Sequence, residues 1–242
     1  MDRTTKIDFN CDLGEGLNNE HLLMPYISSC NIACGGHAGS PQIIDKVISL
    51  ALSHNVKIGV HPSYPDKENF GRVVLEMTDL ELQGSLKNQL QLFKERAAMQ
   101  DATIHHVKPH GALYNLIAVD EEKATLVSKV VQQVFEDVKL YVPFNSKIEK
   151  VAKDFGIEIV YEAFADRNYN DDLTLVSRSE PNATISDKEK VVAHVKRMFH
   201  ESKVKTVQDN EREMKADTFC LHGDNEKAIE ILKNLHREFL SH

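Results

Sequence analysis

Short apolar runs alternate with longer amphipathic segments along the chain, and this alternation restricts the folds that it can adopt. Apolar residues at helical spacing predict helices, and the short apolar runs between them predict buried strands. We expect strands over 6–12, 28–34, 56–60, 103–108, 139–142, 157–162 and 217–223, and helices over 41–54, 77–100, 121–137, 146–156, 186–202 and 225–240. Connections of this length are typical of parallel strands joined by right-handed crossovers.

About seven strand–helix units favour an α/β fold of the (β/α)-barrel type, irregular and seven-stranded. The chain has 242 residues, a length that suits one such barrel, so we expect a single domain over 1–242. A doubly wound open sheet is the alternative, because the pattern of elements does not decide whether the sheet closes.

Composition narrows the partners. The formal net charge is −8, and the basic residues are scattered, which disfavours nucleic acid as a ligand. The sequence has neither a signal-like first segment nor an apolar stretch of about 20 residues, so we expect no membrane association and a cytoplasmic protein. Its four cysteines do not suggest a disulfide framework, and we expect them to be small buried residues.

Polar, glycine- or proline-punctuated segments follow the predicted strands directly. In a parallel barrel the carboxyl ends of all strands emerge on one face, so these segments should converge there. They cover 12–15, 34–39, 61–66, 108–111, 162–167 and 222–224.

Histidines recur at these strand ends, as His37, His61, His110 and His222. Neutral imidazole binds metals and also transfers protons near neutral pH, so both roles are open. Asp12 with His37 and His61 would make a site for a divalent metal ion, which would activate a bound water.

A metal-free site is the alternative interpretation of the same face. Asp12, Glu15 or Glu162 would then act as general base, and a histidine such as His110 would protonate a leaving nitrogen.

Three cations complete the set. Arg72 and Arg167 are candidates to bind a substrate carboxylate through a guanidinium fork, although Arg167 could instead hold its own loop. Lys108 would stabilise developing negative charge or pair with Glu162. The sequence contains neither a G-x-x-x-x-G-K-[ST] phosphate loop nor a G-x-S-x-G nucleophile elbow.

Taken together, the strings resemble the LamB/YcsF family, also known as the 5-oxoprolinase A-subunit family. The match is collinear from about Lys6 to the last helix. The strings are DFNCDLGE (8–15), NIACGGHAGS (31–40), HPSYPD (61–66), FGR (70–72), HVKPHGALYN (106–115), EAFADRNY (162–169), LVSRSEP (175–181) and HGD (222–224).

The resemblance implies a barrel of the glycoside hydrolase/deacetylase type, acting on a cyclic amide. The implied activity is ATP-dependent opening of 5-oxo-L-proline to L-glutamate, in a complex with subunits B and C. A homo-oligomer is left open. The family motifs place site residues at Asp12, Glu15, His37, His61, Lys108, His110, Glu162, Arg167, His222 and Asp224.

Our own assignment of roles puts Asp12, Glu15, Lys108, His110 and Glu162 in catalysis. Substrate binding falls to Arg72, Arg167, His222 and Asp224, and metal binding to Asp12, His37 and His61.

Four positions depart from the family pattern. Gly36 stands where a larger residue is usual, Ser40 where Asp is usual, Val73 where a second Arg is frequent, and Asp172 where Gly is frequent. Ser40 matters most, because a missing carboxylate would weaken a cation contact or a helix N-terminus.

Two other functions compete with the lactam hydrolase. One is a metal-dependent carbohydrate or N-acyl deacetylase, which rests on fold analogy alone. The other is a non-catalytic scaffold protein of the complex, against which the density of polar residues argues.

Overall fold

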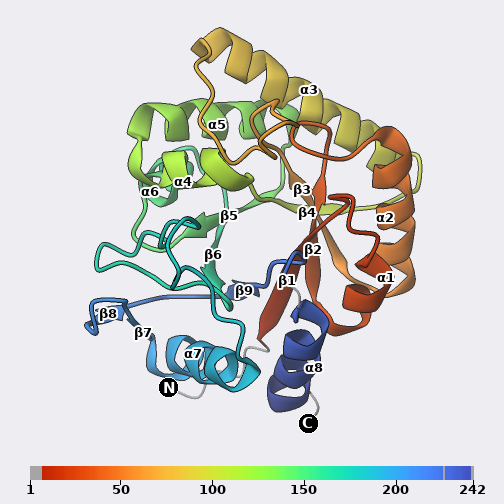
Figure 1. The fold of residues 1–242 in the computed structure, drawn as a ribbon. Coiled ribbons are helices and arrows are strands. Elements are labelled where there is room, and N and C mark those ends of the chain that lie inside the picture. Colours follow the sequence, from red (N-terminus) through yellow and green to blue (C-terminus); the bar gives the residue numbers. More distant parts are fainter. Residues whose placement is uncertain (1–6, 226, 241–242) are drawn as a thin grey trace.

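The computed structural model describes residues 7–225 and 227–240, and its centre is a closed barrel of seven parallel strands (Figure 1). The predicted barrel is therefore confirmed, and the open-sheet alternative is wrong. Lys6, with which the first expected strand begins, lies outside the described residues. The strands, in barrel order, are β1 (Asp8–Leu13), β2 (Ser29–Ala33), β3 (Lys57–His61), β4 (Ile104–Val107), β5 (Lys139–Pro143), β6 (Ile159–Phe164) and β9 (Thr218–Cys220).

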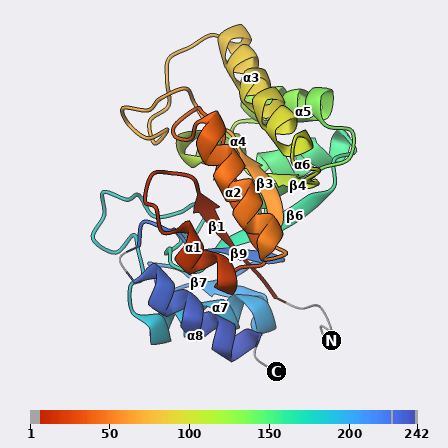
Figure 2. The same cartoon turned by 90° about the vertical axis from the view of Figure 1, so that its right-hand side faces the viewer.

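Helices surround the barrel, and neighbours along the chain pack on one another (Figures 1 and 2). The six expected helices are α2 (Pro41–Ser53), α3 (Asp79–Ala98), α5 (Glu121–Val134), α6 (Lys147–Asp154), α7 (Lys188–Glu201) and α8 (Ala228–Phe239). The sequence pattern did not predict the short α1 (Glu20–Leu23), the 3₁₀ turn η1 (Met24–Tyr26) or α4 (Gly111–Val119). No described helix has both the length and the apolar character needed to cross a membrane.

Side-chain caps explain where the principal helices begin. Thr78 and Glu81 form a reciprocal capping box at the start of α3. The cap of α7 is Asp187, which accepts a hydrogen bond from the Lys190 amide. The sequence pattern pointed to the helix beginning one residue earlier, at 186.

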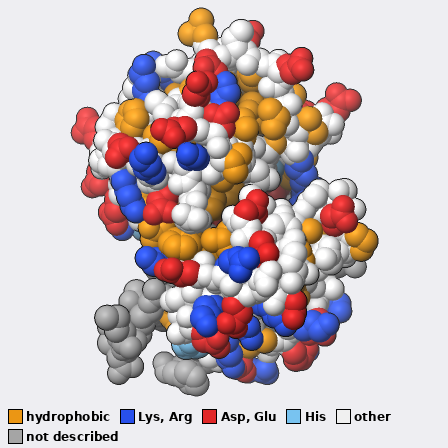
Figure 3. Space-filling model, turned by 90° about the vertical axis from the view of Figure 1, so that its left-hand side faces the viewer, with side chains coloured by type: hydrophobic (Ala, Val, Ile, Leu, Met, Phe, Trp, Pro, Cys, Tyr) orange, Lys and Arg blue, Asp and Glu red, His pale blue; other side chains and the backbone are white. Residues whose placement is uncertain are grey.

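A hairpin of β7 (Lys203–Lys205) and β8 (Glu211–Glu213) lies outside the barrel and follows α7. The long 165–187 segment precedes that helix, and on this side of the molecule basic and acidic side chains are intermingled (Figure 3). This face therefore offers no concentrated basic surface for nucleic acid.

Polar side chains, rather than aliphatic ones alone, fill part of the barrel interior. Asn31 donates to Asn10 Oδ1 and Asp12 Oδ1, each at 2.8 Å, and its own oxygen lies 2.7 Å from His106 Nε2. Gly59 makes room for the His106 ring, because a Cβ at Gly59 would lie 2.0 Å from Nε2. This network fixes the orientation of Asp12 at the carboxyl end of β1. The four cysteines are buried and unpaired, as expected.

Candidate functional site

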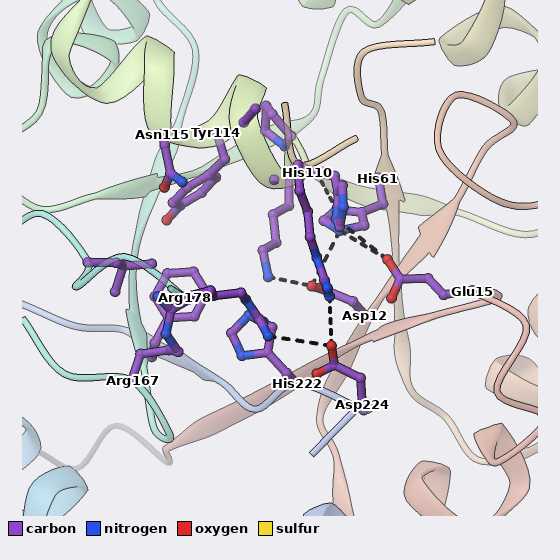
Figure 4. A pocket seen from close by; sticks show the side chains of 18 of the residues that line it. Asp12, Glu15, His61, His110, Tyr114, Asn115, Arg167, Arg178, His222 and Asp224 are labelled. Carbon is purple, nitrogen blue, oxygen red and sulfur yellow. Dashed lines mark hydrogen bonds and ion pairs between the residues drawn. The ribbon is translucent and has the colours of Figure 1, made fainter. Parts of the chain in front are cut away.

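The predicted polar segments converge on the carboxyl-end face of the barrel. Asp12 ends β1, His61 ends β3, and Lys108 and His110 follow β4 directly. Together with loop residues from β6 and β9 they surround a cavity of ≈ 260 Å³ (Figure 4). Its lining includes Asp12, Glu15, His61, Arg72, Lys108, His110, Arg167, Arg178, His222 and Asp224. His37 and Glu162 are buried beside the cavity.

Lys108 is the most heavily engaged side chain of the site. Its Nζ lies 2.9 Å from Asp12 Oδ1, 3.0 Å from Glu162 Oε1 and 3.0 Å from Cys220 Sγ, and the side chain is 2% exposed. Burial lowers the pKa of the ammonium, but Asp12, Cys220 and Glu162 outweigh it and hold that pKa well above its usual value. Lys108 is therefore a permanent buried cation. The expected Lys108–Glu162 pair is present.

Asp12 is a permanent anion for the matching reason. Its burial raises the pKa of the carboxyl, but His61 and Lys108 outweigh that effect and hold the pKa well below the usual range. A carboxylate this acidic is a poor proton acceptor near neutral pH. The geometry thus suits Asp12 to orienting Lys108 and His61 better than to acting as a general base.

Glu15, His37, His61 and His110 form a second cluster, with one nitrogen or oxygen atom of each within 4.8 Å of all the others. His37 Nε2 lies 2.8 Å from Glu15 Oε1, and the ring stacks on His110 with 3.7 Å between centroids. Burial lowers the pKa of His37 and holds that of His110 well below its usual value, so both rings are neutral at pH 7. Three imidazoles and a carboxylate of this kind are able to hold a metal ion.

The predicted metal set of Asp12, His37 and His61 is thus regrouped. Glu15 and His110 join His37 and His61, whereas Asp12 lies with Cys220 and His222 in a separate group. Asp12 Oδ2 still lies 3.4 Å from His61 Nε2, so the two groups adjoin.

His222 lies across the cavity and is held by Asp166, a residue to which the sequence pattern gave no role. Its Nδ1 is 2.9 Å from Asp166 Oδ1, and its ring stacks on Phe164. Burial raises the pKa of Asp166, but His222 and Asn225 outweigh this and lower it. An imidazole oriented through Nδ1 by a carboxylate presents Nε2 for proton transfer.

Arginines surround the mouth of the cavity. Arg72 Nη2 lies 2.7 Å and Arg178 Nη1 lies 3.5 Å from Asp224 Oδ2, and Figure 4 shows Arg178 and Asp224 side by side. Arg167 is 5% exposed and donates to the carbonyl oxygens of Ala183 and Val176. Arg167 therefore holds the 165–187 segment, which was the alternative interpretation of this residue.

Two of the departures from the family pattern have a structural explanation. A Cβ at Gly36 would lie 2.3 Å from Ser63 Oγ and 2.5 Å from Gln89 Oε1, so Gln89 fills the space that a larger residue would need. Ser40 is the N-cap of α2 and accepts from the Ile43 amide at 3.3 Å. Ser40 therefore keeps the capping role open to an Asp. Nothing in the structure explains Val73 or Asp172.

Asp166 and Arg178 are the cavity residues that the sequence pattern did not single out. Both lie inside strings that carried the resemblance, EAFADRNY and LVSRSEP, which was the available signal. Their contacts are made across more than forty residues of sequence, to His222 and Asp224. Spacing along the chain does not show such contacts.

Comparison with known proteins gives consistent results. The family model described as "LamB/YcsF family" matches residues 7–242. Proteins named as the A-type component of 5-oxoprolinase, from Bacillus cytotoxicus and Pyrococcus abyssi, are each 38% identical, over 96% of this chain and 94% and 93% of theirs.

A solved structure titled as a lactam utilization protein, from Thermus thermophilus, has a TM-score of 0.89 at 31% identity and covers 97% of both chains. A GH113 β-1,4-mannanase shares the fold alone, with a TM-score of 0.53 at 13% identity, 90% of this chain and 88% of that one being covered. With a family model spanning nearly the whole sequence and relatives of this identity, the chain belongs to the LamB/YcsF family.

Proposed function

We propose that this chain is the lactam-binding component of an ATP-dependent 5-oxoprolinase, which opens 5-oxo-L-proline to L-glutamate. The observation that carries the proposal is the permanent Lys108 cation at the floor of a small cavity with arginines at its mouth. A volume of ≈ 260 Å³ lies below the usual range for drug-sized ligands and suits a compact metabolite. The names of the relatives support a lactam as the substrate class.

Charge placement suits the carboxylate and the ring carbonyl of such a substrate. Arg178 and Arg72 at the mouth would bind the carboxylate, because a guanidinium matches it through two parallel hydrogen bonds. Lys108 would stabilise negative charge that develops on the ring oxygen. Its contact with Cys220 Sγ is the one that a substrate oxygen would replace, because sulfur is a weak acceptor.

Proton transfer is assigned to His222, with Asp166 as its orienting partner. Water adds to the ring carbonyl carbon, the ring C–N bond breaks, and the nitrogen receives a proton. His222 is placed to deliver that proton, while Asp12 and Glu162 keep Lys108 charged and in place. Glu15 remains the second candidate base on the opposite wall.

Coupling to ATP is chemically reasonable, since an unstrained lactam is a poor electrophile. The sequence has no G-x-x-x-x-G-K-[ST] loop, so we propose that subunits B and C contribute to nucleotide use. A cytoplasmic location goes with this proposal.

The test is to purify the chain together with its B and C partners and to measure glutamate formed from 5-oxo-L-proline with and without ATP. Asp12→Asn should lower kcat severely because Lys108 loses its anchor. Undiminished turnover in that variant would remove Asp12 from the mechanism, and no ATP-dependent glutamate with the wild-type complex would refute the function.

The histidine cluster is the observation that favours the deacetylase alternative. That activity requires no nucleotide, so release of acetate from an N-acetylated sugar in the absence of ATP would support it instead.

A further inference from the structure

The hydrogen bonds of His61 determine which of its nitrogens faces the neighbouring side chains. Nδ1 lies 2.6 Å from the carbonyl oxygen of Lys108. A carbonyl oxygen only accepts, so Nδ1 carries the hydrogen, and in a neutral ring Nε2 is left with a lone pair. That lone pair faces the cluster that contains Glu15 and His110.

His110 is held in the same manner through its other nitrogen. Nε2 lies 2.9 Å from the carbonyl oxygen of Phe70 and therefore donates to it. Nδ1 is then the acceptor atom, and it lies 2.9 Å from Nε2 of His61. Two nitrogen lone pairs thus face each other at hydrogen-bond distance without a hydrogen between them.

His37 completes the pattern through Ser63. The single hydroxyl hydrogen of Ser63 goes to the carbonyl oxygen of Tyr64 at 2.8 Å. Ser63 Oγ can therefore only accept from His37 Nδ1, 2.9 Å away. The remaining nitrogen of His37, Nε2, presents its lone pair to Glu15 Oε1 at 2.8 Å.

Four acceptor atoms consequently meet in a buried position where their repulsion is strong. A cation between them removes the repulsion, and their separations fit one. The four atoms are 2.8, 2.9, 3.5 and 3.9 Å apart in the pairs His37–Glu15, His61–His110, His110–Glu15 and His61–Glu15. Tetrahedral Zn²⁺ with bonds of about 2.0–2.1 Å requires ligand atoms roughly 3.3 Å apart.

We propose that Glu15, His37, His61 and His110 bind one divalent transition-metal ion, with Zn²⁺ as the best fit. Imidazole ligands select such metals over Mg²⁺ and Ca²⁺, which take oxygen ligands. Each histidine also donates its other N–H to a carbonyl or a hydroxyl oxygen, which is the usual support of a metal-binding histidine.

The ion would lie in the wall of the substrate cavity, because Glu15, His61 and His110 line it. Metal binding does not depend on the proposed hydrolase activity, since it is a property of this chain alone. Failure of one proposal therefore leaves the other standing.

The test uses the full-length chain after removal of metals with a chelator. Zn²⁺ is titrated calorimetrically, and Co²⁺ is added separately so that its visible absorption reports the geometry around the metal. The expected result is one equivalent of Zn²⁺ and the intense visible bands of tetrahedral Co²⁺. Weak absorption typical of octahedral Co²⁺, or less than about 0.1 equivalent of bound Zn²⁺, would overturn the proposal in favour of a shared proton.

Variants locate the site. His110→Gln and Glu15→Gln should each lower the Zn²⁺ affinity by more than about 100-fold. Ser63→Ala, which removes only the partner of His37 Nδ1, should lower it by about 10–100-fold and covers the case in which a ligand variant does not fold. His54→Gln, on the exposed end of α2, is the matched control and should bind like the wild type. Wild-type affinity in both Glu15→Gln and Ser63→Ala would place the metal elsewhere.

Discussion

Lys108 Nζ and Asp12 Oδ1 lie 2.9 Å apart at the floor of the cavity, although 96 residues separate them in the chain. Both side chains are buried, so each is the condition for the other to remain charged. Glu162 adds a second carboxylate to the same ammonium. The floor of the site is therefore an ionic cluster whose members cannot be removed singly without leaving a buried charge.

Lys108→Met should destabilise the fold as well as abolish activity. It leaves the carboxylates of Asp12 and Glu162 buried without a cation, and removing one partner of a buried pair costs about 3–5 kcal/mol. Urea unfolding at pH 7 measures the loss. Lys188→Met breaks an exposed pair with Glu230 and serves as the control, for which we expect little change. Equal stability of the two variants would contradict the ionic role.

Asp166→Asn should change how stability depends on pH. The folded pKa of Asp166 is lowered, because His222 and Asn225 outweigh the effect of burial. The wild-type carboxylate thus contributes stability that is complete above its unfolded pKa of about 3.9 and is lost as pH falls through the lower folded pKa. The variant lacks this contribution.

The measurement is the difference in free energy of unfolding between wild type and Asp166→Asn, from pH 7 down to pH 3. The difference should be largest at pH 7 and should shrink on acidification. A difference that stays constant over this range would show that Asp166 stabilises the fold by packing instead of by its charge.

Gly36→Ala and Gly84→Ala should have opposite effects on stability. A Cβ at Gly36 would lie 2.3 Å from Ser63 Oγ, so the change should cost about 1–3 kcal/mol. Gly84 lies within α3 and has open space around it, so alanine there should stabilise by about 0.5–1 kcal/mol. Thermal unfolding of both variants checks this, and a stabilised Gly36→Ala would show that Gln89 and Ser63 yield easily.

The barrel followed from the sequence because its signal is local and repeated. Each buried strand and amphipathic helix is visible in a few consecutive residues, and parallel connections then bring the strand ends together. The same rule placed Asp12, His61 and Lys108 on one face. The helix α4 was missed because it begins at Gly111, directly inside a motif, with no side-chain cap.

The roles within the site did not follow from the sequence, because they depend on which atoms meet. Glu15 replaces Asp12 as the partner of His37 only through the geometry of the loop after β1. Asp166 acquires its role from a contact with His222, 56 residues away. Neither relationship is carried by spacing.

Arg178→Ala and Arg167→Ala should separate substrate binding from loop structure. Arg178 is partly exposed at the cavity mouth and makes a single long contact of 3.5 Å, with Asp224, so its guanidinium is available to a substrate carboxylate. Loss of a charged hydrogen bond worth about 1.5–3 kcal/mol predicts a KM about 10–100-fold higher, with little change in stability. Arg167, in contrast, donates to the carbonyl oxygens of Ala183 and Val176.

Arg167→Ala should therefore lower the free energy of unfolding by about 1–3 kcal/mol, because two buried acceptors lose their donor. Steady-state kinetics of the complex with 5-oxo-L-proline, set beside urea unfolding of each variant, separates the two effects. Arg178→Lys keeps the charge but not the planar fork, so it should recover only part of the affinity. A higher KM in Arg167→Ala with unchanged stability, and no kinetic effect in Arg178→Ala, would reverse the assignment and return the carboxylate to Arg167.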